Sequence, residues 1–142
     1  EKAIDFCITL LNKNSIVIDG GAHIGCFCIP ISKVCSMVHC FEMQRDIMDI
    51  LRSNIRKNSV KNILTYNIAL GAIPGRASIN SKITDGTSAG SEVDYTSSEP
   101  MNYGGISIGP GSEIVPMCTL DSLGLSPSFI KFDLEGSEPL AF

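Results

Sequence analysis

Residues 15–25 read SIVIDGGAHIG, a short apolar run that ends in an acid and is followed at once by glycines. The apolar part, Ile16-Val17-Ile18, is typical of a buried strand in a parallel sheet. The glycines allow a tight turn and a close approach of the backbone to a ligand. A helix that starts after them would offer free backbone N–H groups. The stretch therefore predicts a strand, a glycine-rich turn and a helix in immediate succession.

The flanking sequence repeats this order, with apolar stripes at helical spacing and short apolar runs in turn. Helices are expected at residues 1–12, 24–35 and 47–58, and further strands at 37–41, 63–70 and 129–133. Pro30 should kink the second helix, and another helix should begin at Ser137. Strands that alternate with helices predict an α/β fold with a doubly wound, mostly parallel, Rossmann-like sheet.

Length and charge narrow the possibilities. The chain has 142 residues and a net charge of −4, which fits one domain over residues 1–142 and argues against nucleic acid as a partner. No apolar run reaches the length of a membrane helix, so no membrane association is expected. A Ser/Gly-rich insertion spans about residues 84–112. Residues 76–79 and 105–108 could pair as a short hairpin; otherwise residues 84–112 form a long loop, which is either a solvated insertion or a cover for the acceptor pocket.

The cysteines favour a reducing compartment. All lie outside Cys-x-x-Cys pairs, and most lie within apolar stretches; they are Cys7, Cys26, Cys28, Cys35, Cys40 and Cys118. Free cysteine behaves as a small hydrophobe, so we expect buried thiols, no metal site and a cytoplasmic location. A disulfide-rich secreted module is the alternative.

Acidic side chains end three of the predicted strands: Asp19, Glu42 and Asp133. In an open parallel sheet, ligands bind beyond the carboxyl ends of the strands. Glu42 follows Gly25 by 17 residues, the place where an acid accepts both hydroxyls of a ribose. A glycine-rich turn, such an acid and the strand–helix–strand order together predict a cofactor that contains adenosine.

The glycine spacing selects among such cofactors. Gly20-Gly21-x-x-x-Gly25 differs from the G-x-G-x-x-G of dinucleotide sites, and the chain lacks the Gly-Lys-Ser/Thr of a P-loop. An acid directly before the glycines repels pyrophosphate and suits the ammonium and sulfonium of S-adenosylmethionine. An NAD-dependent oxidoreductase on the same sheet remains the rival enzyme.

Several segments match one family in order and spacing. They are VIDGGAHIG (17–25), FE (41–42), NIALG (67–71), TLDSL (119–123) and FIKFDLEGSE (129–138). With them the chain resembles the FkbM family of S-adenosylmethionine-dependent methyltransferases. The resemblance implies methyl transfer to a hydroxyl of a sugar, a glycan or a small metabolite.

The resemblance also implies roles for individual residues. The methionine part of the cofactor is assigned to the turn and the acid before it: Asp19, Gly20, Gly21, Ala22, His23 and Gly25. Glu42 should hold the ribose, with Ile68 and Ala69 near the adenine. Asp133 and Glu135 are the candidate catalytic groups, as a general base or, less directly supported, as ligands of a divalent cation. His23 is a further candidate base.

The chain departs from the family pattern in two respects. His23 stands where the family usually has Asn, and Met43 where it has Pro. The family sheet resembles one of seven strands, whereas only four core strands are predicted here. We therefore expect the chain to be a truncated methyltransferase domain, and a degenerate, non-catalytic cofactor-binding module is the alternative function.

Overall fold

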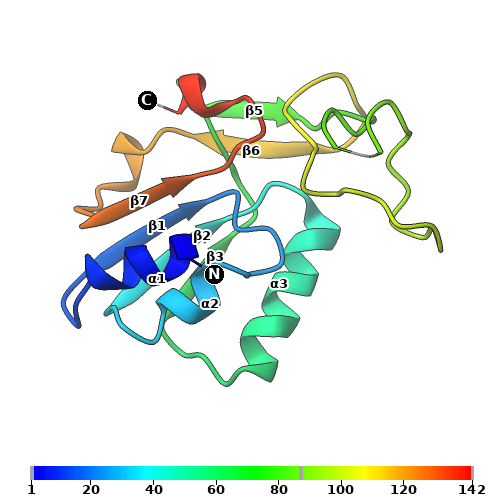
Figure 1. The fold of residues 1–142 in the computed structure, drawn as a ribbon. Helices are drawn as coiled ribbons and strands as arrows, with labels where there is room; N and C mark the ends of the chain where they lie inside the picture. The colour runs from blue at the N-terminus through cyan, green and yellow to red at the C-terminus, as the bar shows by residue number, and fades with distance from the viewer. Residues whose placement is uncertain (1, 87, 142) are drawn as a thin grey trace.

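A four-stranded parallel sheet lies at the centre of the computed structural model, which describes residues 2–86 and 88–141 (Figure 1). Its strand order is β3-β2-β1-β7, and every neighbouring pair is parallel. The strands are β1 (Ile16–Gly20), β2 (Met37–Phe41), β3 (Ile63–Tyr66) and β7 (Phe129–Phe132). The chain order reverses at β1, with β2 on one side and β7 on the other. The predicted α/β, Rossmann-like fold class is confirmed.

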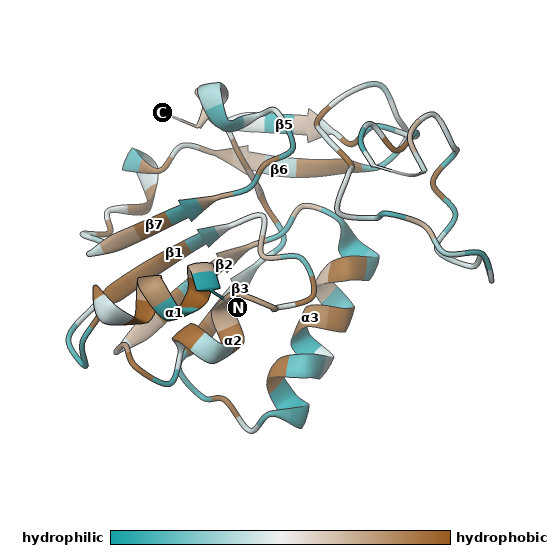
Figure 2. Ribbon diagram, in the orientation of Figure 1, coloured by the Kyte–Doolittle hydropathy of each residue, from teal (hydrophilic) through white to brown (hydrophobic). Residues whose placement is uncertain are grey.

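Three helices cover one face of this sheet: α1 (Lys2–Thr9), α2 (Cys28–Ile31) and α3 (Arg45–Lys57) (Figure 1). Side chains alternate along a strand, so Val17 of β1 packs against the helices while Ile18 packs into a cluster on the opposite face. Figure 2 shows β1 and β7 hydrophobic along most of their length and hydrophilic toward their carboxyl ends. The polar side chains thus gather at the edge where ligands bind in such sheets.

A second, three-stranded sheet has the order β4-β6-β5. Its strands are β4 (Ala69–Leu70), β5 (Gly75–Ser78) and β6 (Ile114–Cys118). The prediction of one strand over 63–70 was wrong, because β3 ends at Tyr66 and the chain crosses to the second sheet. The amide of Asn67 fixes this crossing by donating to the carbonyl oxygens of Glu42 and Met43. Strand β6 was not predicted, and Pro116 within it explains why, since proline is rare inside strands.

The predicted helix over 24–35 was also wrong in extent. Only Cys28–Ile31 is helical, because the chain first makes a turn in which Gly25 has a φ of +98°. Pro30 is the third residue of α2, where its missing N–H is not needed, so it fits the short helix without a kink. Near the C-terminus, the expected helix is a 3-10 turn over Glu138–Leu140.

The pairing of residues 76–79 with 105–108, one of the two alternatives, is present only at one point, where Ile79 and Ile108 form an antiparallel bridge. Strand β5 instead pairs antiparallel with β6. The described part of residues 84–112 contains no helix or strand. Glu1, Thr87 and Phe142, which fall in predicted segments, lie outside the described residues. Within the described ranges, no helix has the length and hydropathy to span a bilayer.

Candidate functional site

A cleft of about 660 Å³, partly open to solvent, lies at the carboxyl ends of the central strands. It is lined by Gly21 after β1, Glu42 after β2, Ile68 after β3 and Asp133 after β7. Residues of the insertion, which we define as residues 84–112, close a further side of it. The cleft therefore sits at the switch point of the sheet, where the strand order reverses.

Glu42 is the buried acid of the cleft, with 5% of its surface exposed. One carboxylate oxygen accepts the backbone N–H of His23 at 3.0 Å, and the other accepts that of Gln44 at 2.9 Å. Burial raises the pKa of Glu42, and these two N–H groups partly offset the rise. A carboxylate has about four acceptor sites, so each oxygen can still accept a hydroxyl.

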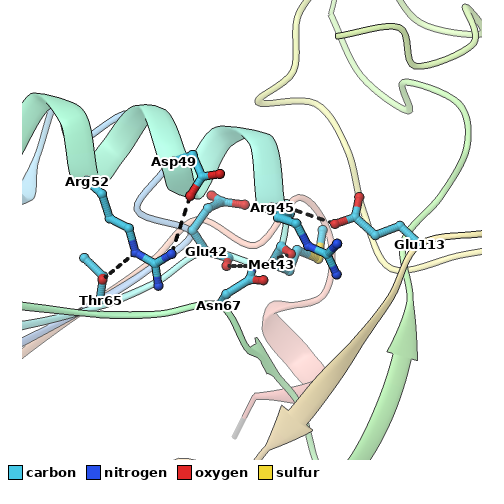
Figure 3. Close-up of polar contacts among 8 residues, drawn as sticks. All are labelled: Glu42, Met43, Arg45, Asp49, Arg52, Thr65, Asn67 and Glu113. Atoms are coloured by element: carbon cyan, nitrogen blue, oxygen red, sulfur yellow. Dashed lines mark hydrogen bonds and ion pairs between the residues drawn. The ribbon is translucent and has the colours of Figure 1, made fainter.

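The chain after Glu42 is held from two sides (Figure 3). The amide of Asn67 reaches the carbonyl oxygens of Glu42 and Met43 at 2.9 and 2.8 Å. The backbone N–H of Arg45 donates to Glu113 at 3.0 Å, which ties the start of α3 to the segment before β6. These contacts fix the position of the Glu42 backbone before any ligand binds.

Asp19 lies on the helix-covered face of β1 and is fully buried, outside the lining of the cleft. The Lys131 ammonium is 3.2 Å from its Oδ1, donates to the carbonyl oxygen of Gly21 at 3.0 Å, and lies 3.6 Å from Asp133. Burial raises the pKa of Asp19 to about 6, although the charge of Lys131 lowers it. Neither Asp19 oxygen accepts a well-aligned hydrogen bond from the described residues.

Sequence reasoning missed Lys131. The available signal was a lysine inside an otherwise apolar strand, directly beside Asp19 in the register of β1 and β7. Its ammonium also lies 5.9 Å from the ring centre of Phe27. Lys131 thus contacts Asp19 below the turn, the carbonyl oxygen of Gly21 within the turn, and Asp133 after β7.

The glycine-rich turn brings the backbones of β1 and β7 together. Gly21 has a φ of +72°, and a Cβ there would lie 1.9 Å from the carbonyl oxygen of Asp133. Gly20, Ala22 and Gly25 do not line the cleft; they are buried behind it and shape the turn. Their predicted contact with a cofactor stays a prediction.

Three further predicted polar residues line the cleft: His23, Asp133 and Glu135. Burial raises the pKa of Glu135, and the charge of Asp133 adds to the rise. Burial lowers the pKa of His23. His23 and Glu135 both have left-handed backbones, with φ of 48° and 52°. Such conformations cost about 1–3 kcal/mol in residues other than glycine and cluster at functional sites.

Another part of the lining is apolar. Ile68 and Ala69, the predicted adenine contacts, line it together with Ile106 and Ile108 of the insertion. Ala69 and Ile106 are buried in one hydrophobic cluster. A cleft lined by apolar side chains and a buried carboxylate can hold both a planar ring and a diol.

Asp19, Cys28 and Cys40 form a buried cluster whose ligand atoms lie within 4.8 Å of one another. They come together through the packing of α2 on the sheet, which the cysteine spacing does not reveal. The set is one ligand short of a tetrahedral zinc site. Lys131 already supplies positive charge to Asp19, so the cluster is better described as a buried thiol pair beside an ion pair.

No family model and no curated protein matches the chain. An rRNA methylase from Streptococcus thermophilus is similar over 48% of this chain and 38% of its own, at 18% identity and a TM-score of 0.47. TYW2 from M. jannaschii, solved with AdoMet, is similar over 45% of this chain and 30% of its own chain, at 27% identity and a TM-score of 0.42. A tRNA methyltransferase from Aquifex aeolicus is similar over 46% of this chain and 28% of its own chain, at 26% identity and a TM-score of 0.44. The chain thus matches less than two-fifths of the length of these proteins.

Proposed function

We propose that the cleft binds S-adenosylmethionine and that the chain belongs to an O-methyltransferase. One observation carries the proposal: three carboxylates line the cleft, from Glu42, Asp133 and Glu135, and no lysine or arginine of the described residues does. Such a cleft attracts a cofactor with a sulfonium and an ammonium. It repels the pyrophosphate of a dinucleotide. The acidic lining therefore favours S-adenosylmethionine over NAD.

The shape of the cleft supports the same assignment. Glu42 would accept the ribose hydroxyls, and Ile68 and Ala69 would pack against the adenine. The methionine part would lie toward Gly21 and His23. The resemblance to the FkbM family, with its motif at residues 129–138, belongs to this proposal.

Bound S-adenosylmethionine would supply a methyl group activated by the sulfonium. The task of the protein is then to orient an acceptor hydroxyl and remove its proton. Glu135 is the preferred base, because its raised pKa makes it a better proton acceptor than an ordinary carboxylate. Asp133 is the alternative. A sugar, glycan or small metabolite fits the acidic cleft as the acceptor, and a polyanion does not.

Calorimetric titration with S-adenosylhomocysteine, S-adenosylmethionine and NAD tests the proposal. We expect the first two to bind and NAD not to bind. Glu42→Gln should weaken binding about 10-fold or more, because a charged acceptor of two hydroxyls is lost. Glu99→Gln, at an exposed glutamate outside the cleft, is the matched control and should bind like the wild type.

Other outcomes would contradict the proposal. Binding of NAD alone would support the oxidoreductase. Binding of none of the three would refute cofactor binding by this cleft, and binding of S-adenosylmethionine without methyl transfer to any screened hydroxyl would favour the non-catalytic cofactor-binding module. A cytoplasmic location is proposed with the function, and the free thiols of the structure agree with it.

A further inference from the structure

We propose that the insertion is part of the cofactor site and not a cover for the acceptor. In this assignment Ile106 and Ile108 form part of the apolar wall of the nucleoside half of the cleft, and Gln44 holds the segment that carries them. The inference rests on the proposed function and adds to it a determinant of cofactor affinity. It replaces the sequence-based expectation that the insertion covers the acceptor pocket.

The first support is the position of the wall. Gly104, Ile106 and Ile108 line the same cleft as Glu42 and Ile68. Ile106 is 1% exposed and packs in the cluster that contains Ala69, the predicted adenine contact. The insertion therefore supplies apolar surface next to the ribose acid.

The second support is the Gln44 clamp. Gln44 is 3% exposed, and both ends of its amide are bonded to the insertion. Its Nε2 donates to the carbonyl oxygen of Tyr103 at 2.8 Å, and its Oε1 accepts the hydroxyl of Tyr95 at 2.8 Å. Its backbone N–H donates to Glu42 at 2.9 Å. One residue thus bonds both to the ribose acid and to the insertion that carries the apolar wall.

The clamp is rigid on the insertion side. The rings of Tyr95 and Tyr103 stack with centroids 5.1 Å apart, and the Tyr103 hydroxyl donates to the carbonyl oxygen of Asp94. Burial raises the pKa of Tyr95, so its hydroxyl stays protonated and remains a donor near neutral pH. The wall is therefore held in place before the cofactor arrives, which lowers the ordering cost of binding.

The insertion also approaches the glycine-rich turn. A Cβ at Gly104 would lie 4.0 Å from Nε2 of His23. The insertion thus reaches the cleft at two cofactor-facing places, the end of β2 and the turn after β1.

Two ligands separate the nucleoside half of the cleft from the amino-acid half: S-adenosylhomocysteine and 5′-methylthioadenosine. Tyr95→Phe removes only the hydroxyl of the clamp. We expect it to weaken both ligands by the same factor, about 2–10-fold, the range for one hydrogen bond. Ile108→Ala, which removes apolar wall, should also weaken both. Tyr66→Phe is the control, because it removes a phenol bonded to His39 at 2.9 Å outside the cleft.

The outcomes separate this inference from the function on which it rests. If the wild type binds S-adenosylhomocysteine and the Tyr95 and Ile108 variants bind it equally well, the inference is wrong and the function stands. If the variants weaken S-adenosylhomocysteine but not 5′-methylthioadenosine, the wall lies at the amino-acid end and the inference is again wrong. If the wild type binds neither ligand, both fail. Thermal unfolding of each variant establishes that it is folded.

Discussion

Replacing Lys131 with methionine should destabilise the fold above neutral pH, because it leaves the buried carboxylate of Asp19 without its cation. The ammonium lies 3.2 Å from Oδ1 of Asp19, and the Asp19 side chain is completely buried. Methionine keeps most of the length and apolar surface of the lysine stem. The substitution therefore removes mainly the charge.

The magnitude follows from the pKa of Asp19, which burial raises from 3.8 to about 6 even with Lys131 present. A gap of about 2 pKa units corresponds to about 3 kcal/mol. The folded state binds this proton more tightly than the unfolded chain does. The free energy of unfolding therefore falls as the pH rises from 3.8 to 6, by about 3 kcal/mol for this group alone.

Without the ammonium the pKa of Asp19 rises further, so the fall continues above pH 6. At pH 8 we expect Lys131→Met to be up to about 3 kcal/mol less stable than the wild type, the low end for removing one member of a buried ion pair, and at pH 7 about half of that, because protonation of Asp19 limits the loss to about 1.4 kcal/mol for each pH unit above 6. The Lys131 side chain is 23% exposed, which is why the low end applies. Near pH 5 the gap should narrow, because Asp19 is then protonated in both proteins.

Urea unfolding at pH 5, 6, 7 and 8 measures this effect. Asp19→Asn combined with Lys131→Met should recover most of the loss at pH 7, because no buried charge remains. Lys82→Met breaks an exposed ion pair with Glu92 and should change stability by less than about 1 kcal/mol. Equal midpoints for wild type and Lys131→Met at pH 8, or no recovery in the double variant, would refute the reasoning.

Four other predictions follow from single contacts. The affinity for S-adenosylhomocysteine should fall as the pH is lowered, and the fall should begin above pH 4.5, the ordinary pKa of a glutamate, because burial raises the pKa of Glu42. The ribose hydroxyls need the charged carboxylate of Glu42 as their acceptor. Titrations between pH 5 and 8 measure this profile, which Glu42→Gln should flatten. Gly21→Ala should cost about 3 kcal/mol or more in urea unfolding, since its Cβ meets a carbonyl oxygen at 1.9 Å, whereas Gly90→Ala, with a φ of +87° and open space, should cost about 1 kcal/mol. Once an acceptor is found by screening, Glu135→Gln should lower turnover at saturating cofactor about 10²–10⁴-fold; unchanged turnover would exclude it as the base. Of the six thiols, exposed Cys26 should react first with a thiol reagent in the native state, and all should react in denaturant; fewer would indicate disulfides.

The central sheet was predictable because its strands are short, mainly apolar runs that lead into a polar residue or glycine. Residues 37–41 and the run at 129–133 needed only this pattern. The pattern failed where apolar residues are buried outside regular helices and strands. Residues 24–35 are apolar because a compact turn is buried there as well as a helix, and periodicity does not distinguish the two. The strand over 63–70 was divided because Asn67 bonds to a segment 25 residues earlier.

The candidate site was predictable only in part, for a related reason. Glu42, Asp133 and Glu135 follow strands directly, so their place at one edge follows from the topology. Gln44 and Lys131 act through partners 59 and 110 residues away, at Tyr103 and Gly21. Such pairings form only in the assembled fold, so no local sequence pattern predicts them.

The place of Lys131 also bears on the charge of the cleft. Its ammonium lies below the glycine-rich turn, bonded to the carbonyl oxygen of Gly21 and close to Asp19. It compensates Asp19 inside the core, lies 3.6 Å from the Asp133 carboxylate at the rim, and does not itself line the cleft. Glu42 and Glu135 therefore keep their negative charge available to a ligand. Because the Lys131 ammonium lies below the turn, the cleft above it keeps an acidic lining. An acidic lining favours the binding of a positively charged sulfonium cofactor.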